Sequence, residues 1–291
     1  MKSESYEPRI YLLPNLMTAG NLFCGFAAIL RILEGALLQV QEQNPYPLYH
    51  EAIVFILGAC VFDLLDGRVA RLGGSDSPFG REFDSLADVV SFGVAPALLV
   101  YRIVLQEFRL GWLVAVVYLT CGTLRLARFN CVAAAKPVGS KADPDFSGFP
   151  IPAAAGVTAS ITLFLLGLQE SEREIGRWKY ALPPLLLFLS FMMFSRFRYP
   201  SFKAINWKTH KSPKKFLLIV IVLVLTIYYY RWLPAILFIA YLLYGFFRPF
   251  VSLRLRKEIE EDDEEEELLE GPSGESIPVV ENPGHTEKRD S

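Results

Sequence analysis

The feature that most limits the fold of this chain is a series of about eight apolar segments separated by short polar stretches. Hydrophobic residues make up 52% of the 291 residues and charged residues only 21%, a balance that indicates a membrane protein. A spanning helix needs about 20 apolar residues, and the segments are near or somewhat below that length. The sequence therefore predicts an all-α fold, a polytopic membrane bundle with about eight transmembrane helices. The segments are 14–33, 51–67, 84–106, 111–130, 150–168, 180–195, 215–230 and 232–248.

The C-terminal end of the chain differs from this body. Residues 1–250 contain every apolar segment and are expected to form the membrane domain. Residues 251–291 begin with a few basic residues and continue into the acidic run EIEEDDEEEELLE. Low hydrophobicity and a block of like charges are typical of disorder, so we expect residues 251–291 to be a disordered cytoplasmic tail.

Four carboxylates lie in residues 63–88 at spacings that suit helices. Asp63 and Asp66 are three residues apart, and Asp84 and Asp88 are four apart, so each pair can share one face of a helix. Carboxylates this close repel one another unless a cation lies between them. Hard oxygen ligands suit Mg²⁺ or Mn²⁺, and ionisable groups among apolar segments are functional candidates. The alternative is two pairs of solvated carboxylates at helix ends.

The residues between the two acidic pairs also suit a phosphate ligand. Gly67 and Ala70 are small, so a ligand can approach the backbone closely on that face. Arg71 can bind a phosphate through its planar guanidinium group. The stretch 73–78 is rich in Gly, Ser and Asp and predicts a turn that folds the second helix back on the first.

The pattern formed by these residues resembles the signature of a known family. Asp63-x-x-Asp66-Gly67-x-x-Ala70-Arg71, then eight residues, then Gly80-x-x-x-Asp84-x-x-x-Asp88 is similar to the motif of the CDP-alcohol phosphatidyltransferases. All eight specified positions and both spacers agree. The resemblance implies an enzyme of the membrane in which an alcohol displaces CMP from CDP-diacylglycerol with the help of Mg²⁺ or Mn²⁺.

The resemblance also implies roles for individual residues. Asp88 resembles the general base of the family, and whether it also binds a second metal stays open. The first segment carries Asn15, Thr18 and Asn21 at spacings of three, which is compatible with a capped helix start or with contacts to a head group. The expected metal ligands are Asp63, Asp66, Asp84 and Asp88, and the expected CDP-diacylglycerol contacts are Asn15, Thr18, Gly67, Ala70, Arg71, Ser77 and Gly80.

Three further strings resemble the serine-using branch of the family. They are S-F-G-V-A-P-A at 91–97, R-L-A-R-F-N at 125–130 and G-F-P-I-P at 148–152. They favour L-serine as the acceptor, although glycerol 3-phosphate, inositol or choline would use the same acidic cluster. Arg125, Arg128 and Asn130 are candidate acceptor contacts, and the alternative is that the arginines extend to the membrane interface. By physics alone, Pro96 predicts a helix kink and Gly93 predicts close packing.

Loop charges predict the orientation in the membrane. If the N-terminus is cytoplasmic, the loops and chain ends on the cytoplasmic side of the membrane hold eighteen Lys and Arg residues. The loops on the opposite side hold five. This asymmetry satisfies the positive-inside rule and places the aspartates at the cytoplasmic face of the cell membrane. The basic, aromatic loop 196–215 lies between two apolar segments, so we expect it to attract anionic lipid head groups rather than nucleic acid.

Two hypotheses from other classes compete with the enzyme. A metal-ion transporter would use the aspartates as a path across the membrane, and a membrane scaffold would only bind the metal. A transporter predicts acidic residues at mid-membrane on several spans, whereas here they are concentrated within residues 63–88. This concentration of acidic residues in one stretch favours the enzyme over the transporter. Short spans interrupted by polar residues are also compatible with a homodimer.

Overall fold

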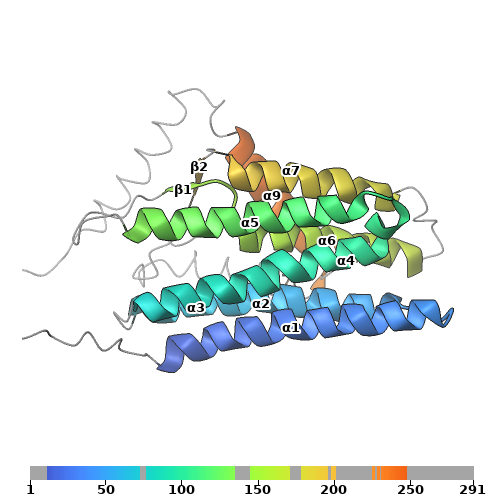
Figure 1. The fold of residues 1–291 in the computed structure, drawn as a ribbon, viewed down its shortest axis with the longest axis horizontal. Coiled ribbons are helices and arrows are strands. Elements are labelled where there is room, and N and C mark those ends of the chain that lie inside the picture. The colour runs from blue at the N-terminus through green and yellow to red at the C-terminus, as the bar shows by residue number, and fades with distance from the viewer. Residues whose placement is uncertain are drawn as a thin grey trace, which may run out of the picture. The chain divides into compact units, whose positions relative to one another are not determined.

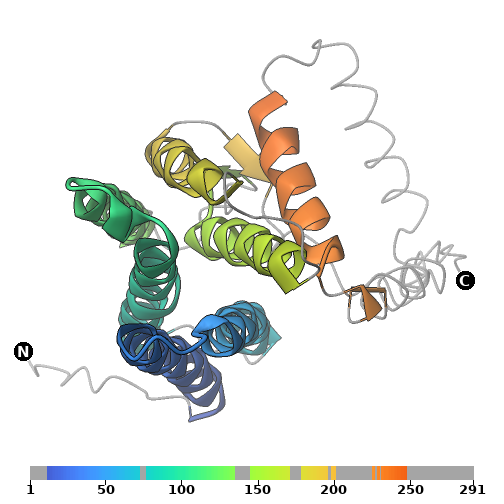
Figure 2. The ribbon, with the colours of Figure 1, turned by 90° about the vertical axis from the view of Figure 1, so that its right-hand side faces the viewer.

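The computed structural model is a helical bundle in which the helices between Leu12 and Phe194 run roughly along one direction, whereas the last described helix, Leu233–Phe247, lies across them (Figures 1 and 2). It describes residues 12–72, 77–134, 145–170, 178–195, 198–200, 225–226, 228–229 and 231–247. The α-helices are α1 (Leu12–Val40), α2 (Tyr46–Leu72), α3 (Pro78–Asp88), α4 (Ala95–Ile103), α5 (Gly111–Ala134), α6 (Ile151–Glu170), α7 (Leu182–Phe194) and α9 (Leu233–Phe247). A π-helix, Val89–Val94, joins α3 to α4, and two short 3₁₀ turns cover Leu105–Glu107 and Trp178–Ala181.

The helices pack in neighbouring pairs around α6. Helix α1 packs along α2, and the α3–α4 helix lies across α1, while α5 packs against α7. Helix α6 contacts α2 on one side and α9 on the other, and it lies in the interior of the end-on view (Figure 2). Its apolar side chains are therefore mostly buried, and its buried hydroxyls bond to carbonyls one turn earlier in the same helix, as Thr162 does to Thr158.

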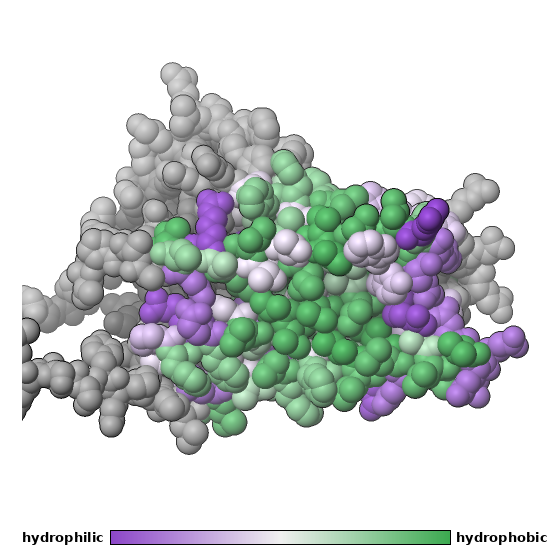
Figure 3. Space-filling view, viewed as in Figure 1, coloured by the Kyte–Doolittle hydropathy of each residue, from purple (hydrophilic) through white to green (hydrophobic). Residues whose placement is uncertain are grey.

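The outside of the bundle is suited to lipid. Five helical stretches are long and apolar enough to cross a membrane, and two shorter apolar helices accompany them. Large apolar side chains such as Phe23 and Leu37 of α1 are exposed, and the face shown in Figure 3 is apolar in the middle and hydrophilic toward both ends of the described helices. The chain is thus a membrane-embedded helical bundle, as predicted. The five long stretches are Leu13–Val40, Tyr46–Gly67, Pro78–Ile103, Gly111–Val132 and Ile151–Leu168.

The predicted number of eight spans is not established. Seven of the predicted segments coincide with described helices, although the observed helix ends differ from the predicted ends by several residues. Most of the segment 215–230 lies outside the described residues. The acidic residues 251–291 and the basic loop 201–215 also lie outside them, so the disordered tail and the lipid-binding loop stay predictions.

The third apolar segment contains an irregularity that the sequence partly predicts. Pro96 has no N–H and cannot donate to the carbonyl of Phe92, four residues earlier. In the structure the stretch before Pro96 widens into the π-helix, and Tyr118 of α5 donates its hydroxyl to the Phe92 oxygen at 3.1 Å. The proline therefore changes the register of the helix directly after Asp88, and a buried tyrosine from the neighbouring helix satisfies the carbonyl.

A small β-ladder adds to the predicted helices. Strand β1 (Asp145–Ser147) pairs antiparallel with β2 (Arg198–Pro200), which brings the segments before α6 and after α7 together. Gly148 follows β1 with a φ of +86°, and a side chain there would collide with the Met193 carbonyl. Only glycine suits both the left-handed backbone and the close approach, so the G-F-P-I-P string has a structural purpose at this turn.

Candidate active site

Three of the four aspartates converge. Asp63 and Asp66 come from α2 and Asp84 from α3, and one carboxylate oxygen from each lies within 4.8 Å of the others. Asp66 is 4% exposed, whereas Asp63 and Asp84 are partly accessible. Three carboxylates at this separation repel one another, and hard oxygens of this kind are the donors that Mg²⁺ and Mn²⁺ prefer. The donor set therefore fits a divalent cation.

Helix α1 supplies a hydrogen bond to the buried member of this group. The Thr18 hydroxyl lies 3.2 Å from Asp66 Oδ2 and at the same distance from the Pro14 carbonyl oxygen. Thr18 is itself buried. The structure places Thr18 against a carboxylate of the cluster, and its predicted contact with the donor lipid stays a prediction.

The fourth aspartate lies beside the group of three. Asp88 is buried at the end of α3, and its Oδ1 accepts a hydrogen bond from Asn21 Nδ2 at 3.0 Å. It lies close enough to Asp63 and Asp84 to interact electrostatically with both carboxylates. The structure therefore separates three converging carboxylates from a fourth that is held by an amide of α1.

The start of α3 forms one rim of the site. Ser77 precedes Pro78 and caps the helix, because its side-chain oxygen accepts a hydrogen bond from Gly80 N at 3.0 Å. A β-carbon at Gly80 would lie 3.3 Å from Asn15 Oδ1, so glycine lets the two helices approach here. Asn15 Nδ2 is buried and has no hydrogen-bond partner among the described residues, which leaves a donor for a ligand.

The opposite rim is the end of α2. A β-carbon at Gly67, one residue after Asp66, would meet no atom of the described residues within 4 Å, so open space lies next to this glycine in that part of the chain. Ala70 and Arg71 belong to the last turn of α2, but their side chains lie outside the described residues. Their predicted contacts with the nucleotide stay predictions.

The candidate acceptor residues lie on α5 and have different surroundings. Arg125 is partly buried and interacts electrostatically with Asp88 and Asp63, so it faces the acidic cluster. Arg128 is exposed. Asn130 donates to Ser85 Oγ at 2.9 Å and Glu82 Oε2 at 3.4 Å, both on α3. Among the three, Arg125 is the residue that the fold brings to the aspartates.

Comparison with known proteins agrees with the motif and the site. The family model described as CDP-alcohol phosphatidyltransferase matches residues 11–194, which include all four aspartates and the helices that carry them. This chain belongs to the CDP-alcohol phosphatidyltransferase family. Because the family consists of transferases, the hypothesis of a metal-ion transporter has no support.

Named relatives of this transferase come from distant organisms. The CDP-diacylglycerol–serine O-phosphatidyltransferase of Helicobacter pylori is 36% identical over 245 residues, which cover 82% of this chain and 91% of that protein. The enzyme of the same name from Bacillus subtilis is 34% identical over 197 residues, 66% of this chain and 91% of its own length. The archaetidylserine synthase of Methanothermobacter thermautotrophicus is 38% identical over 153 residues, 52% of this chain and 58% of that protein.

Sequence reasoning about this transferase missed one contact of the site, that of Asn21 with Asp88. Asn21 was placed on the polar face of the first helix but was not assigned to an aspartate. The spacing of Asn15, Thr18 and Asn21 carried the signal, because three-residue steps put all of them on the face that α3 approaches. The sequence did not indicate that Asn21 would meet Asp88.

Proposed function

We propose that this chain transfers the phosphatidyl group of CDP-diacylglycerol to the hydroxyl of L-serine, with release of CMP and formation of phosphatidylserine. The observation that carries the proposal is the identity of 36% across most of the chain with an enzyme named for this reaction. The arrangement of Asp63, Asp66, Asp84 and Asp88 on two adjoining helices supports it, because the chain keeps every acidic residue of the motif.

The diphosphate of the donor lipid is negatively charged, so the site must bind it with groups that offset this charge. We assign Asp63, Asp66 and Asp84 to a divalent cation, Mg²⁺ or Mn²⁺, and Asp88 can contribute to a second one. When bound, such a cation supplies positive charge against the diphosphate. Thr18 keeps the Asp66 carboxylate in place through its hydrogen bond.

The nucleotide is assigned to the two rims of the site. The open space beside Gly67 admits the cytidine close to the helix backbone, as a side chain there would not. Asn15 offers its buried, unpartnered Nδ2 as a donor to the nucleotide, and Ser77 and Gly80 shape the start of α3. Ala70 and Arg71 complete this surface by the family motif, with Arg71 on a phosphate.

The chemical step is a direct displacement at phosphorus. The serine hydroxyl oxygen forms a bond to the phosphorus that carries diacylglycerol, the bond from that phosphorus to the CMP oxygen breaks, and the hydroxyl proton passes to Asp88. Asp88 is buried and lies next to the converging carboxylates, which suits a group that acts on the attacking hydroxyl. The described residues contain no side chain that the motif marks as a covalent nucleophile.

The acceptor is assigned to the α5 side of the site. Arg125 interacts electrostatically with Asp88 and Asp63, so a serine whose carboxylate binds its guanidinium would have its hydroxyl near Asp88. Arg128 and Asn130 are assigned to the outer part of the same subsite. Glycerol 3-phosphate, inositol and choline are the alternative acceptors for the same chemistry.

We place the active site at the cytoplasmic face of the cell membrane, because the positive-inside rule orients the chain in this way. The substrates then reach the site from the inner leaflet and the cytosol. A homodimer is the expected assembly, and the mass of the detergent-solubilised protein measures it directly.

One assay tests the proposed reaction. Purified full-length protein is incubated with CDP-diacylglycerol, Mn²⁺ or Mg²⁺, and labelled serine, inositol, glycerol 3-phosphate or choline in separate reactions. We expect CMP release together with a labelled lipid only with serine. A labelled lipid from another alcohol would overturn the acceptor, and the absence of transfer to every alcohol would overturn the transferase activity.

A further inference from the structure

Asn21 is the only hydrogen-bond partner of the Asp88 carboxylate among the residues that the structure describes. Its Nδ2 donates to Asp88 Oδ1 at 3.0 Å, and neither side chain is more than 5% exposed. The contact joins α1 to the end of α3, two segments 67 residues apart in the sequence. It leaves the second oxygen of Asp88 without a hydrogen bond from the described residues.

The backbone of Asn21 is fixed to the segment that follows Asp88. Ser91 of the π-helix donates its hydroxyl to the Asn21 carbonyl oxygen at 3.0 Å. One turn later on α1, a β-carbon at Gly25 would lie 2.6 Å from Ser91 Cα, so the glycine permits this close crossing. The hydrogen bond and the close crossing together fix the main chain of α1 against the π-helix. The amide of Asn21 therefore reaches Asp88 from a fixed position.

The amide does not have the properties of a residue kept for fold stability. With Nδ2 committed to Asp88, Asn21 Oδ1 is buried and has no hydrogen-bond partner among the described residues. A buried polar atom without a partner opposes folding, and an apolar side chain would avoid this penalty. Residues that oppose folding in this way are concentrated at functional sites.

The groups around Asp88 explain why a neutral donor is needed. Asp63, Asp84 and Asp66 place negative charge near it, and Arg125 is a cation that interacts electrostatically with it. A carboxylate at position 21 would add repulsion, and a second cation there would compete for Asp88 as an ion pair. An amide can hold one oxygen of Asp88 while adding no net charge.

From these contacts we propose that Asn21 is a positioning residue for the phosphatidyl transfer: it pins Asp88 through Oδ1, so that Oδ2 takes the proton of the attacking hydroxyl. The inference rests on the proposed function, because it assigns Asn21 through the role of Asp88 as base. Asn21 itself touches neither the donor lipid nor the three converging carboxylates in this account.

The test compares three substitutions of Asn21 in the full-length protein. Asn21→Ala removes the donor, Asn21→Asp keeps the shape but replaces the donor with a charge, and Asn21→Ser keeps a smaller donor. Thr162→Ala is the matched control, because Thr162 is a buried hydroxyl that bonds to the Thr158 carbonyl of its own helix, α6. For each protein we would measure kcat, the KM for CDP-diacylglycerol, the affinity for Mn²⁺ and the thermal unfolding midpoint.

We expect Asn21→Ala and Asn21→Asp to lower kcat by about 10–100-fold, the usual effect of losing a residue that orients a functional group. The KM and the Mn²⁺ affinity of the site formed by Asp63, Asp66 and Asp84 should stay within about threefold of wild type, because these three residues do not depend on Asn21 in this account. Asn21→Ser should retain more turnover than Asn21→Ala. The unfolding midpoints should change no more than that of the control.

Three results would overturn the inference. Wild-type kcat in Asn21→Asp would show that only the shape matters. A loss of kcat that merely follows a loss of thermal stability would make Asn21 structural, and a matching loss of Mn²⁺ affinity would make it an organiser of the whole cluster. Wild-type protein that transfers to no alcohol would instead overturn the proposed function and the inference together, so the two failures are distinguishable.

Discussion

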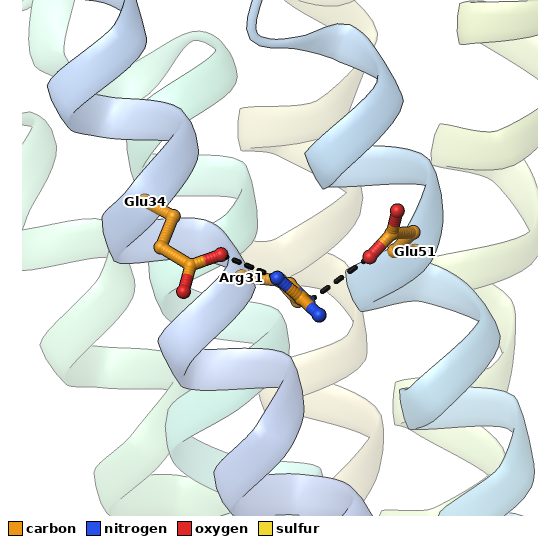
Figure 4. Close-up of polar contacts among 3 residues, drawn as sticks. All are labelled: Arg31, Glu34 and Glu51. Carbon is orange, nitrogen blue, oxygen red and sulfur yellow. Dashed lines mark hydrogen bonds and ion pairs between the residues drawn. The ribbon is translucent and has the colours of Figure 1, made fainter.

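Two groups of charged residues contact α1 at different points along its length, and their partners differ. At one, Arg31 of α1 lies between Glu34 and Glu51, with nitrogen–oxygen distances of 2.6 and 3.0 Å (Figure 4). At the other, about 15 Å along α1 by helix geometry, α1 meets the aspartates of α2 and α3. The first group contains its own cation, whereas the side-chain hydrogen bonds that reach Asp66 and Asp88 come from the neutral donors Thr18 and Asn21.

The arginine group and the aspartate cluster also differ in their exposure to solvent. The three side chains of the arginine group are 40 to 51% exposed, while Asp66 and Asp88 are at most 5% exposed. Ion pairs that are half exposed add little to stability, and carboxylates crowded together in the interior are unfavourable without a ligand. This difference agrees with our proposal that the aspartate cluster carries the chemistry and that the arginine group belongs to the scaffold.

The largest expected effect is that of Asp88→Asn. The amide keeps the shape of the side chain but cannot take the proton, so turnover should fall about 1000-fold, within the range for loss of a general base. Binding of CDP-diacylglycerol should survive. CMP release and equilibrium binding of the donor lipid measure the two quantities, and turnover near the wild-type rate would remove Asp88 from the mechanism.

Asp63→Ala should act on binding instead. It removes one of three converging carboxylates, and a single charge-assisted contact is worth roughly 1.5–3 kcal/mol, so Mn²⁺ affinity should fall by about 10–100-fold. Metal-dependent binding of the nucleotide should weaken with it. Titration of Mn²⁺ by electron paramagnetic resonance measures the first effect, and unchanged affinity would contradict the assignment of Asp63.

Arg31→Met tests the other side of the comparison. It removes the cation of the scaffold group, and we expect the thermal unfolding midpoint to change little, because the ion pairs are about half exposed and screened by solvent. Turnover should stay within about twofold of wild type. Thermal unfolding and CMP release are the measurements, with Glu51→Gln as a milder variant. A large loss of turnover would make this group part of the site.

The smallest effect concerns an ion pair outside the spans, between Glu107 and Lys179. The hydrogen bond from Lys179 lowers the pKa of Glu107 below its ordinary value of about 4.3, and the same bond raises the pKa of Lys179. A lowered carboxyl pKa stabilises the fold above the unfolded-state value, and this contribution is lost as the pH falls through the folded-state value. We expect the ion pair to contribute less than about 1 kcal/mol to the free energy of unfolding, because both groups are accessible to solvent.

The measurement for this pair is thermal unfolding at pH 7 and pH 3. The difference between wild type and Lys179→Met should be present at pH 7 and should shrink at pH 3, where Glu107 becomes protonated. A difference that stays constant between the two pH values would contradict the proposed contribution of the ion pair.

The helices and the acidic motif could be read from the sequence because both are local patterns. Apolar runs predict helices directly, and Asp63, Asp66, Asp84 and Asp88 fall at helical spacings. The ends were less accurate: the first segment was predicted to stop at residue 33, but α1 continues to Val40. The predicted segment stops directly before Glu34, and the ion pairs of Arg31 with Glu34 and with Glu51 on α2 explain how the helix accommodates these charges.

The remaining features depend on contacts between distant segments. Pro96 indicated a kink, but the π-helix and the hydroxyl of Tyr118 that satisfies the Phe92 carbonyl are tertiary. In the same way, three spaced polar residues indicated one face of α1, but the pairing of Asn21 with Asp88 requires α1 to cross α3. The ladder of β1 and β2 joins segments that carry no strand pattern in the sequence.

The most direct test of the account is the rate of CMP release from CDP-diacylglycerol and serine as a function of Mn²⁺ concentration, in wild type, Asp66→Asn and Glu51→Gln. We expect wild type and Glu51→Gln to saturate at the same Mn²⁺ concentration, and Asp66→Asn to need at least about tenfold more. A rate that does not depend on the metal, or an equal shift in both variants, would contradict the claim that the aspartate cluster is the catalytic centre.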